Sequence, residues 1–273
     1  MPHPHYAAAH KNSSVYSTLT PCATLSIDRT IGMSRLTQKL LRHIVDAAAD
    51  DSNVYIYGEI GTGKKIAATM IHKLSVRRMH PFVMINCGAL YRNRIRPEPA
   101  KNEVMLYADA ENSFRNCFSK ARKGTLFLED IGQLGPGLQS LLLQLIKETV
   151  CSLGNGRSSG APSPRIITSS HLDLHTSLRN GTLHSEIYHQ LRPVLIGVDP
   201  LRKCKKDIPA LANYYLNCYS KKRKPRELPE AIIRQLLAYD WPGNLYELQN
   251  TIERYLVYDQ ISFLHTRMRT GNN

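Results

Sequence analysis

The sequence predicts an α/β fold, in which a parallel sheet is covered by helices on both faces, followed by a small subdomain made only of helices. Short β-rich runs alternate with helical patterns up to Pro200, and three helical patterns then follow without a strand between them. One predicted strand also leads through a glycine-rich turn directly into a helix. At 273 residues, the chain is long enough for one large domain or two moderate ones.

The elements of the α/β part follow from local patterns along the chain. Apolar residues that recur at helical spacing predict helices at 31–49, 64–74 and 138–149. Short runs rich in β-branched and other apolar residues predict strands at 54–57, 81–85, 125–128, 165–168 and 194–198. Because these strands alternate with helices, we expect them to be parallel and to lie in a sheet covered on both faces.

The last quarter of the chain is helical. Amphipathic patterns predict helices at 208–219, 229–239 and 244–258. We therefore expect four regions, namely a flexible tail at 1–28, an α/β core at 29–200, a helical lid subdomain at 201–258 and a C-terminal tail at 259–273. A basic run at 221–226 separates two of the lid helices and is interpreted either as a solvated loop or as a contact to DNA phosphates.

Composition narrows the class of protein. The chain has 36 Lys and Arg residues against 22 Asp and Glu, and its net charge of +14 either favours polyanionic partners or simply keeps the surface soluble. No run approaches the roughly 18 apolar residues that span a membrane. The N-terminus lacks the apolar centre of a signal peptide, so we expect a cytoplasmic protein without membrane contact. The six cysteines form no CxxC pair and are typical of free thiols.

The glycine-rich turn has the pattern of a phosphate-binding loop (P-loop). It follows a predicted strand and opens a helix, which is the context that this motif requires. Its backbone N–H groups and the helix N-terminus favour an anion, and the lysine that ends the motif reaches the β- and γ-phosphates of a nucleotide. The eighth position, usually a Ser or Thr that binds Mg²⁺, is a second lysine. The predicted nucleotide-binding residues are Gly58, Glu59, Ile60, Gly61, Thr62, Gly63, Lys64 and Lys65.

Two acidic residues end the predicted strand at 125–128. Ligands bind at the carboxyl ends of strands in parallel sheets, so Glu129 and Asp130 are candidate catalytic residues. One carboxylate would organise Mg²⁺, with Glu129 as the candidate ligand, and the next would orient the attacking water. The alternative is that the two acids only cap the following turn.

These motifs together resemble the central AAA+ domain of sigma-54-dependent transcriptional activators, also called bacterial enhancer-binding proteins. The likeness runs from Ile31 to Val257. Five segments carry it, in the family's order. This chain has GEIGTGKK where the family has GESGTGKE, INCGAL for VNCAAL, GTLFLEDIGQL for GTLFLDEIGEL, PLR with DIP for PLRER with DIP, and WPGNLYEL for WPGNVREL. The resemblance implies an AAA+ P-loop NTPase with a helical lid. It also implies ATP and Mg²⁺ as cofactors, ring oligomers, and remodelling of sigma-54 RNA polymerase.

The chain departs from the family at the loop that contacts sigma-54 and at the acidic pair. Residues 91–123 fill the gap in which the family carries its GAFTGA loop, and the aligned hexapeptide at 105–110 is MLYADA. Both glycines of the loop are missing, which disfavours direct remodelling of sigma-54. The order of the acids is reversed, because Glu129 replaces the metal-organising Asp and Asp130 replaces the catalytic Glu. Each carboxylate is thereby displaced by about one methylene, which disfavours water activation.

The remaining departures concern arginines and the residues that sense the nucleotide. His184 and Gln190 hold the positions of the family's two trans-acting arginines, and neither offers a permanent bidentate charge. Nearby Arg179 or Arg192 is the alternative source of that charge. The segment Ser169-Ser170-His171 replaces the family's ATN, where Ser170 keeps a hydroxyl, and Tyr246 replaces the lid arginine that contacts nucleotide.

The sequence therefore predicts an ATP-binding regulator of transcription of the sigma-54 type, with weak or no ATP hydrolysis. Its partners would be copies of itself in a ring, an intact paralogue, or sigma-54 RNA polymerase. The sequence contains no recognisable DNA-binding domain of its own. Two alternatives stay open. One is a non-catalytic, nucleotide-responsive scaffold or modulator in a mixed ring with a paralogue, and the other is an active ATPase that remodels another protein or nucleic acid.

Overall fold

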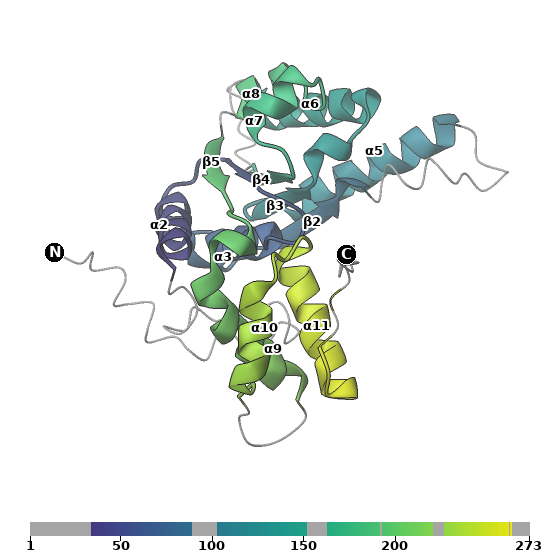
Figure 1. Cartoon of the computed structure of the whole chain (residues 1–273). Coiled ribbons are helices and arrows are strands. Elements are labelled where there is room, and N and C mark those ends of the chain that lie inside the picture. The colour runs from purple at the N-terminus through teal and green to yellow at the C-terminus, as the bar shows by residue number, and fades with distance from the viewer. Residues whose placement is uncertain are drawn as a thin grey trace.

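A computed structural model of the protein describes residues 34–88, 103–151, 163–191, 193–220, 227–261 and 263, and it leaves out the side chains of 103–110 and 149–151. Five parallel strands form one sheet in the order β2-β3-β4-β1-β5 (Figure 1). The bounds of the strands are β1 Val54–Tyr57, β2 Phe82–Asn86, β3 Thr125–Glu129, β4 Arg165–Ser170 and β5 Val194–Gly197. The predicted parallel α/β sheet is thus confirmed.

Helices cover both faces of the sheet, and a separate group of helices forms the lid. The helices of the α/β part are α2 Arg35–Ala49, α3 Lys64–Leu74, α5 Glu103–Lys120, α6 Pro136–Cys151, α7 Leu174–Arg179 and α8 Ser185–Leu191. The helices of the lid are α9 Ile208–Tyr219, α10 Glu230–Ala238 and α11 Asn244–Tyr258. Short 3-10 turns follow β3 at Ile131–Gln133 and precede α9 at Leu201–Lys203 and Lys205–Asp207.

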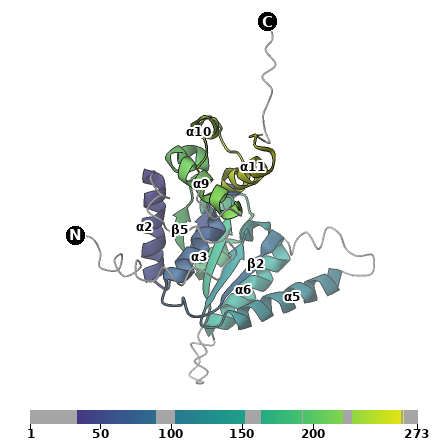
Figure 2. The ribbon, with the colours of Figure 1, turned by 90° about the horizontal axis from the view of Figure 1, so that it is seen from below.

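The alternation of side chains along each strand divides the core of the α/β part into two layers. Val54 and Ile56 of β1 pack on the side of α2 and α3, whereas Tyr55, between them, packs on the side of α5 to α8. Leu126 and Phe127 of β3 divide between the two layers in the same way. Figure 2 shows the sheet between these two groups of helices. Burial on both faces explains why the strands are almost continuously apolar.

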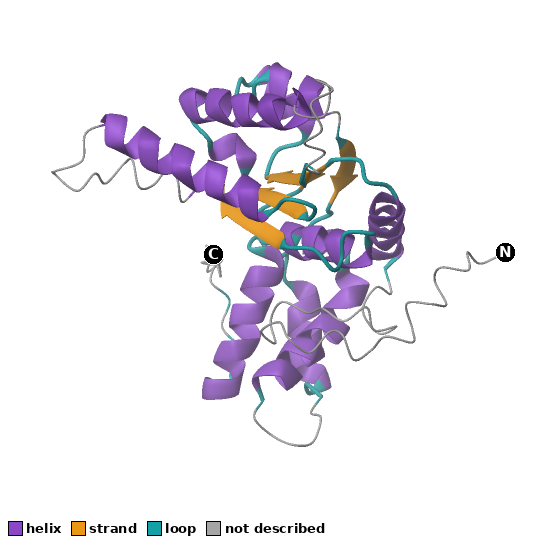
Figure 3. Ribbon diagram, turned by 180° about the vertical axis from the view of Figure 1, so that it is seen from behind, coloured by secondary structure: helices purple, strands orange, loops and turns teal. Residues whose placement is uncertain are grey.

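The lid helices α9, α10 and α11 form a group of their own beyond the sheet (Figure 3), and their side chains form a separate apolar core. Trp241 is completely buried at its centre, and its indole N–H donates to the carbonyl of Leu236 at 2.8 Å. The ring of Trp241 packs edge-on against Tyr239, with centroids 5.1 Å apart. The predicted helical subdomain is therefore confirmed, and the region 221–226 lies outside the described residues.

Two predictions about helices need correction. The first helix begins at Arg35 and not at residue 31, because Ser34 has an extended backbone and its hydroxyl accepts the Thr37 N–H at 3.1 Å as an N-cap. The hexapeptide at 105–110, expected as a substituted loop, lies within α5. Its side chains are outside the description, as are the N-terminal tail and the residues after 263.

The described helices contain no membrane-spanning candidate. None of them combines the length and the hydropathy that a bilayer crossing needs.

Candidate functional site

The glycine-rich turn connects the carboxyl end of β1 to the first turn of α3. Gly61 and Gly63 have φ angles of 80° and 96°, a left-handed backbone that favours glycine over any residue with a Cβ atom. Gly63 is the N-cap of α3, so the helix begins at Lys64 with its free N–H groups directed at the loop. The Thr62 hydroxyl donates to the Glu59 carbonyl at 2.9 Å and holds the turn closed. This backbone is suited to bind an anion.

Lys64 is buried against its own loop. Its ammonium donates to the carbonyls of Gly58 at 2.8 Å and Glu59 at 2.9 Å. Burial lowers the pKa of Lys64 below its ordinary value, and the nearby carboxylates of Asp130 and Glu129 act in the opposite direction. The predicted phosphate lysine and the two predicted acidic residues are therefore electrostatically coupled. Lys65, in contrast, is exposed at the surface.

The lid binds the same loop through its backbone. The Leu245 N–H donates to the Gly61 carbonyl at 3.0 Å, and the side-chain amide of Asn244 donates to the Ile60 carbonyl at 2.9 Å. The amide oxygen of Asn244 accepts the Leu201 N–H at 2.8 Å. Asn244 is fully buried, and its side-chain amide links Ile60 of the loop to Leu201 at the start of the lid.

An ion pair strengthens this contact between the loop and the lid. The Glu59 carboxylate accepts hydrogen bonds from both terminal nitrogens of the Arg202 guanidinium, one of them at 2.7 Å. The hydrogen bond from Arg202 holds the pKa of the Glu59 carboxyl below its ordinary value. Because both side chains are partly exposed, the pair contributes orientation more than stability. Glu59 is predicted from the sequence as part of the loop, but nothing in the sequence indicates Arg202 as its partner.

The two acids at the end of β3 differ in their surroundings. One carboxylate oxygen of Glu129 accepts the Asn86 side-chain amide at 3.3 Å. Asp130 has a left-handed backbone, with φ 54°, and its N–H donates to the Ser169 hydroxyl at 3.2 Å. Its Oδ1 is buried and has no hydrogen-bond partner among the described residues. A buried carboxylate oxygen without a donor fits a hard cation such as Mg²⁺, so the residues present suit the metal that the sequence predicts.

The two serines at the end of β4 have different hydrogen-bond partners. The Ser169 hydroxyl contacts the acidic pair, because it accepts the Asp130 N–H. The Ser170 hydroxyl accepts the Leu172 N–H at 3.1 Å and so bonds within its own turn. Alternation along the strand explains the difference, because neighbouring side chains point to opposite faces of the sheet. His171 is exposed just beyond the strand.

An apolar cavity of about 120 Å³ lies beside the loop, between α2, α3 and the lid. Thr62 and Gly63 of the loop line one end of it. The apolar side chains that line the rest include Leu36, Leu40 and Ile44 of α2, Ile66 and Met70 of α3, and Leu245 of α11. The sequence does not indicate this cavity, because its walls come from segments far apart in the chain, from α2 to α11, whose apolar side chains are typical of ordinary packing.

The positions of the family's trans-acting arginines lie in and just before α8. The His184 N–H donates to the side-chain oxygen of Gln139 at 2.9 Å, which fixes the backbone there. Gln190 is partly buried, and Arg179 is exposed at the end of α7. Arg192 lies outside the described residues. None of the described His, Cys, Asp and Glu side chains forms a group of three that could hold a metal ion.

The parallel sheet, the loop between β1 and α3 and the helical lid define an AAA+ P-loop domain. The family described as "Sigma-54 interaction domain" matches residues 30–197, and the one described as "AAA+ ATPase lid domain" matches residues 202–268. The chain therefore belongs to the sigma-54 interaction domain family of AAA+ transcriptional activators, as its motifs predicted.

Relatives of known name agree with this assignment. The acetoin dehydrogenase operon transcriptional activator AcoR of Bacillus subtilis is 36% identical over 82% of this chain and 37% of its own length. The transcriptional regulatory protein ZraR of Escherichia coli is 34% identical over 92% of this chain and 57% of its own length. The chain thus spans only about half the length, or less, of these relatives.

Solved structures show the same fold. Crystal structures of NtrX from Brucella abortus in complex with ADP and with ATP both have a TM-score of 0.66 and 25% identity, and this chain covers about half of each. Domain III of the replication initiation protein DnaA from Thermotoga maritima has a TM-score of 0.60 at 17% identity, which shows the fold alone.

Proposed function

We propose that this chain binds ATP with Mg²⁺ and acts as a regulator of transcription of the sigma-54 type, with weak or no ATP hydrolysis. The observation that carries the proposal is the loop itself. Two left-handed glycines, a buried lysine and the open end of α3 converge on one point beside an apolar cavity. A left-handed glycine alone is common in structural turns, but a triphosphate is recognised by the combination of all three groups.

Each part of the nucleotide has a matching part of the site. The adenine base would occupy the apolar cavity, and the phosphates would lie over the N–H groups at the start of α3. Lys64 would then exchange its two carbonyl partners for phosphate oxygens. The related NtrX was crystallised with ADP and with ATP, which supports this choice of nucleotide.

Magnesium would be held at the end of β3. Glu129 and Asp130 supply carboxylate oxygens, and the buried Oδ1 of Asp130 lacks any other partner among the described residues. When bound, the metal would neutralise charge on the phosphates. Lys65, at the usual position of a metal-binding hydroxyl, supplies a positive charge in place of a ligand, so we expect weaker metal binding than in a typical P-loop.

Weak hydrolysis follows from the side chains that surround the phosphates. The reversed acidic pair places Asp130, the shorter residue, where the attacking water is oriented. His184 and Gln190 lack the permanent charge of the family's arginines, which contribute about 10³–10⁵ in rate where such arginines have been measured. Tyr246, in place of the lid arginine, is 67% exposed and uncharged.

The regulatory role would be exercised in the cytoplasm, within a ring of identical subunits or a mixed ring with an intact paralogue. The named relatives are transcriptional activators and regulators, which supports this role. Direct contact with sigma-54 RNA polymerase is the less favoured route, because the aligned hexapeptide lacks both glycines and lies within α5.

A nucleotide-responsive scaffold is the second candidate, and the contacts of the lid favour it. Asn244, Leu245 and Arg202 all bind the loop that would hold the phosphates. A nucleotide that moves this loop would therefore change the position of the lid without any chemical step.

Isothermal titration of the purified chain with ATP, with and without Mg²⁺, tests occupancy. We expect the parent chain to bind ATP saturably. The affinity of the Lys64→Ala variant should be lower by about tenfold or more, because each charged hydrogen bond to phosphate contributes about 1.5–3 kcal/mol. Lys73→Ala, at the opposite end of α3, is the matched control and should bind as the parent does. An affinity that is the same in all three proteins would overturn the proposal.

A turnover assay tests the catalytic part of the proposal. We expect phosphate release close to that of Lys64→Ala, even at protein concentrations that favour oligomers. The variant that restores arginine at both positions, His184→Arg with Gln190→Arg, should increase the rate if the missing charge limits hydrolysis. A rate far above the Lys64→Ala background in the parent would instead establish an active ATPase.

A further inference from the structure

We propose that a second surface, distant from the P-loop, binds the phosphate backbone of duplex DNA. This surface lies at the amino ends of β2 and β3, whereas the P-loop lies at the carboxyl end of β1 in the same parallel sheet. It is built by the turn between α3 and β2 and by a second turn between α5 and β3, together with Lys120 at the end of α5. We call it the basic edge and define it as Arg78, His80, Lys120, Arg122 and Lys123.

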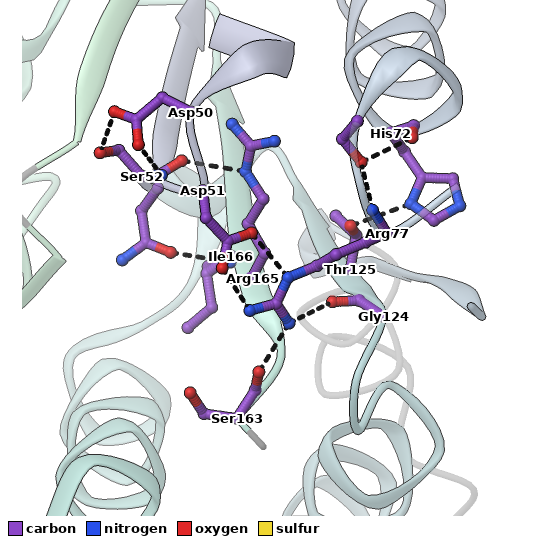
Figure 4. Close-up of polar contacts among 12 residues, drawn as sticks. Asp50, Asp51, Ser52, His72, Arg77, Gly124, Thr125, Ser163, Arg165 and Ile166 are labelled. Carbon is purple, nitrogen blue, oxygen red and sulfur yellow. Dashed lines mark hydrogen bonds and ion pairs between the residues drawn. The ribbon is translucent and has the colours of Figure 1, made fainter. Parts of the chain in front are cut away.

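The two turns of the basic edge are fixed to each other by hydrogen bonds. The Thr125 N–H donates to the Pro81 carbonyl at 2.9 Å, and the Arg77 guanidinium donates to the Gly124 carbonyl at 3.1 Å (Figure 4). A Cβ atom at Gly124 would lie 2.0 Å from the Pro81 carbonyl oxygen, so the two backbones are in direct contact. The cationic side chains on both turns are therefore presented from one rigid base.

The charge of the basic edge is uncompensated. All five of its side chains are exposed, and none has an ion pair or a side-chain hydrogen bond with another described residue. Neighbouring arginines differ in this respect. Arg77 pairs with Asp51, and Arg115 pairs with two glutamates. Cations that stay fully hydrated and unpaired are available to a polyanion.

The chemistry of the basic edge favours a duplex over other polyanions. Four permanent cations on two adjacent turns can each meet a phosphate, and the chain's net charge of +14 adds long-range attraction. The two segments that carry these side chains, residues 75–81 and 120–124, contain no Phe, Tyr or Trp, so they offer none of the stacking rings that single-stranded nucleic acid uses. The contact would be independent of base sequence, because phosphates carry no sequence information.

Fluorescence anisotropy with a labelled duplex about two helical turns long tests the proposal on the full chain. The variant Lys120→Gln with Arg122→Gln should bind several-fold more weakly at low salt, and the slope of log affinity against log salt should fall by about two, one for each lost phosphate contact. The matched control is Lys39→Gln with Arg42→Gln, which removes the same charge from the exposed face of α2 and should leave the slope unchanged.

Several results would overturn the proposal. An equal loss in the control variant would mean that binding reflects net charge alone. Displacement of the duplex by excess ATP would place the phosphates in the P-loop, and equal binding of polyglutamate would indicate an acidic protein as the partner. A second variant, Arg78→Gln with His80→Gln, alters the other turn. It should weaken binding as well, and full retention of affinity in this variant would also contradict the proposal.

Discussion

At the scale of single residues, one buried carboxylate joins the start of the core to the lid. Asp207 is 1% exposed and accepts the Ser34 N–H at 2.8 Å, the Ser34 hydroxyl at 2.6 Å and the Thr37 hydroxyl at 2.6 Å. These donors are the N-cap and first turn of α2, which forms one wall of the apolar cavity. The carboxylate thus holds in place a helix that the proposed base site requires.

Replacement of Asp207 by alanine should destabilise the protein. We expect a loss of about 3 kcal/mol in the free energy of unfolding, since buried donors left without an acceptor cost about 1–3 kcal/mol each and some of them regain water. Urea denaturation of the variant and the parent measures this loss in the free energy of unfolding. Asp199→Ala is the matched control, because Asp199 is exposed and its ion pair with Lys203 is long, at 3.4 Å. Equal losses in the two variants would contradict this role of Asp207.

His72 should make stability depend on pH. It is 5% exposed, with Nδ1 2.9 Å from the Thr125 hydroxyl (Figure 4). Burial lowers its pKa from 6.5 to about 4, and the charges of Arg165, Lys73 and His80 act in the same direction.

The unfolded chain therefore binds a proton at a higher pH than the folded chain. Stability is retained above pH 6.5 and falls as the pH decreases toward 4, by about 3 kcal/mol in total. Urea denaturation between pH 7 and pH 4 should show a flatter dependence for His72→Gln than for His80→Gln, in which only an exposed histidine is lost. Parallel curves for the two variants would be inconsistent with a buried neutral His72.

The residues of the loop could be predicted from the sequence, because glycine, lysine and acid positions carry their chemistry in their identity. Their partners could not. Asn244 contacts Ile60 across 184 positions of the chain, and nothing local to either residue indicates the other.

At the scale of elements, the start of α11 rests directly on the loop. A Cβ atom at Gly61 would lie 2.3 Å from the Gly243 carbonyl oxygen, so a side chain there forces the lid away. Gly61→Ala should therefore weaken ATP binding by about tenfold or more and cost more stability than the left-handed backbone alone, which contributes about 1–2 kcal/mol. Calorimetry and denaturation measure the two effects.

Gly181→Ala separates strain from contact. Gly181 also has a left-handed backbone, with φ 67°, but a Cβ atom there would meet nothing within 4 Å. We expect this variant to show the conformational cost and normal affinity for ATP. A loss of affinity equal to that of Gly61→Ala would argue against contact between lid and loop as the cause.

Most elements could be predicted because strands buried on both faces and amphipathic helices have strong periodic patterns. The helices α3 and α9 have the predicted bounds. The three that were missed, α5, α7 and α8, have weaker signals, and α8 has only seven residues. Helix α7 has only six residues, and α5 mixes polar and apolar residues over a segment that the family resemblance assigned to a loop.

At the scale of the whole molecule, two separate apolar cores meet at the cavity of the proposed nucleotide site. The core of the lid and the core on the α2 side of the sheet share no residue, yet the cavity is lined from both. A nucleotide in this position would contact both parts and would stabilise their association.

Saturating ATP should therefore raise the unfolding temperature of the molecule as one unit. At a hundred times the dissociation constant, the added stability is about 2.7 kcal/mol. Calorimetric scans should show a single transition with ATP, and Lys64→Ala should show no shift. A transition for the lid that does not move with ATP would argue against a site shared between the two parts.

The hydrogen bonds of Lys64 also bear on which anions the loop would accept. Its positive charge already has two oxygen neighbours from the main chain, so any incoming anion must replace them. Inorganic phosphate offers little in return, because it cannot reach the apolar cavity. A nucleoside triphosphate in the proposed site would replace the lost bonds and fill the cavity as well, so the two carbonyl partners of this lysine would favour a nucleotide over the small anions that are abundant in any cell.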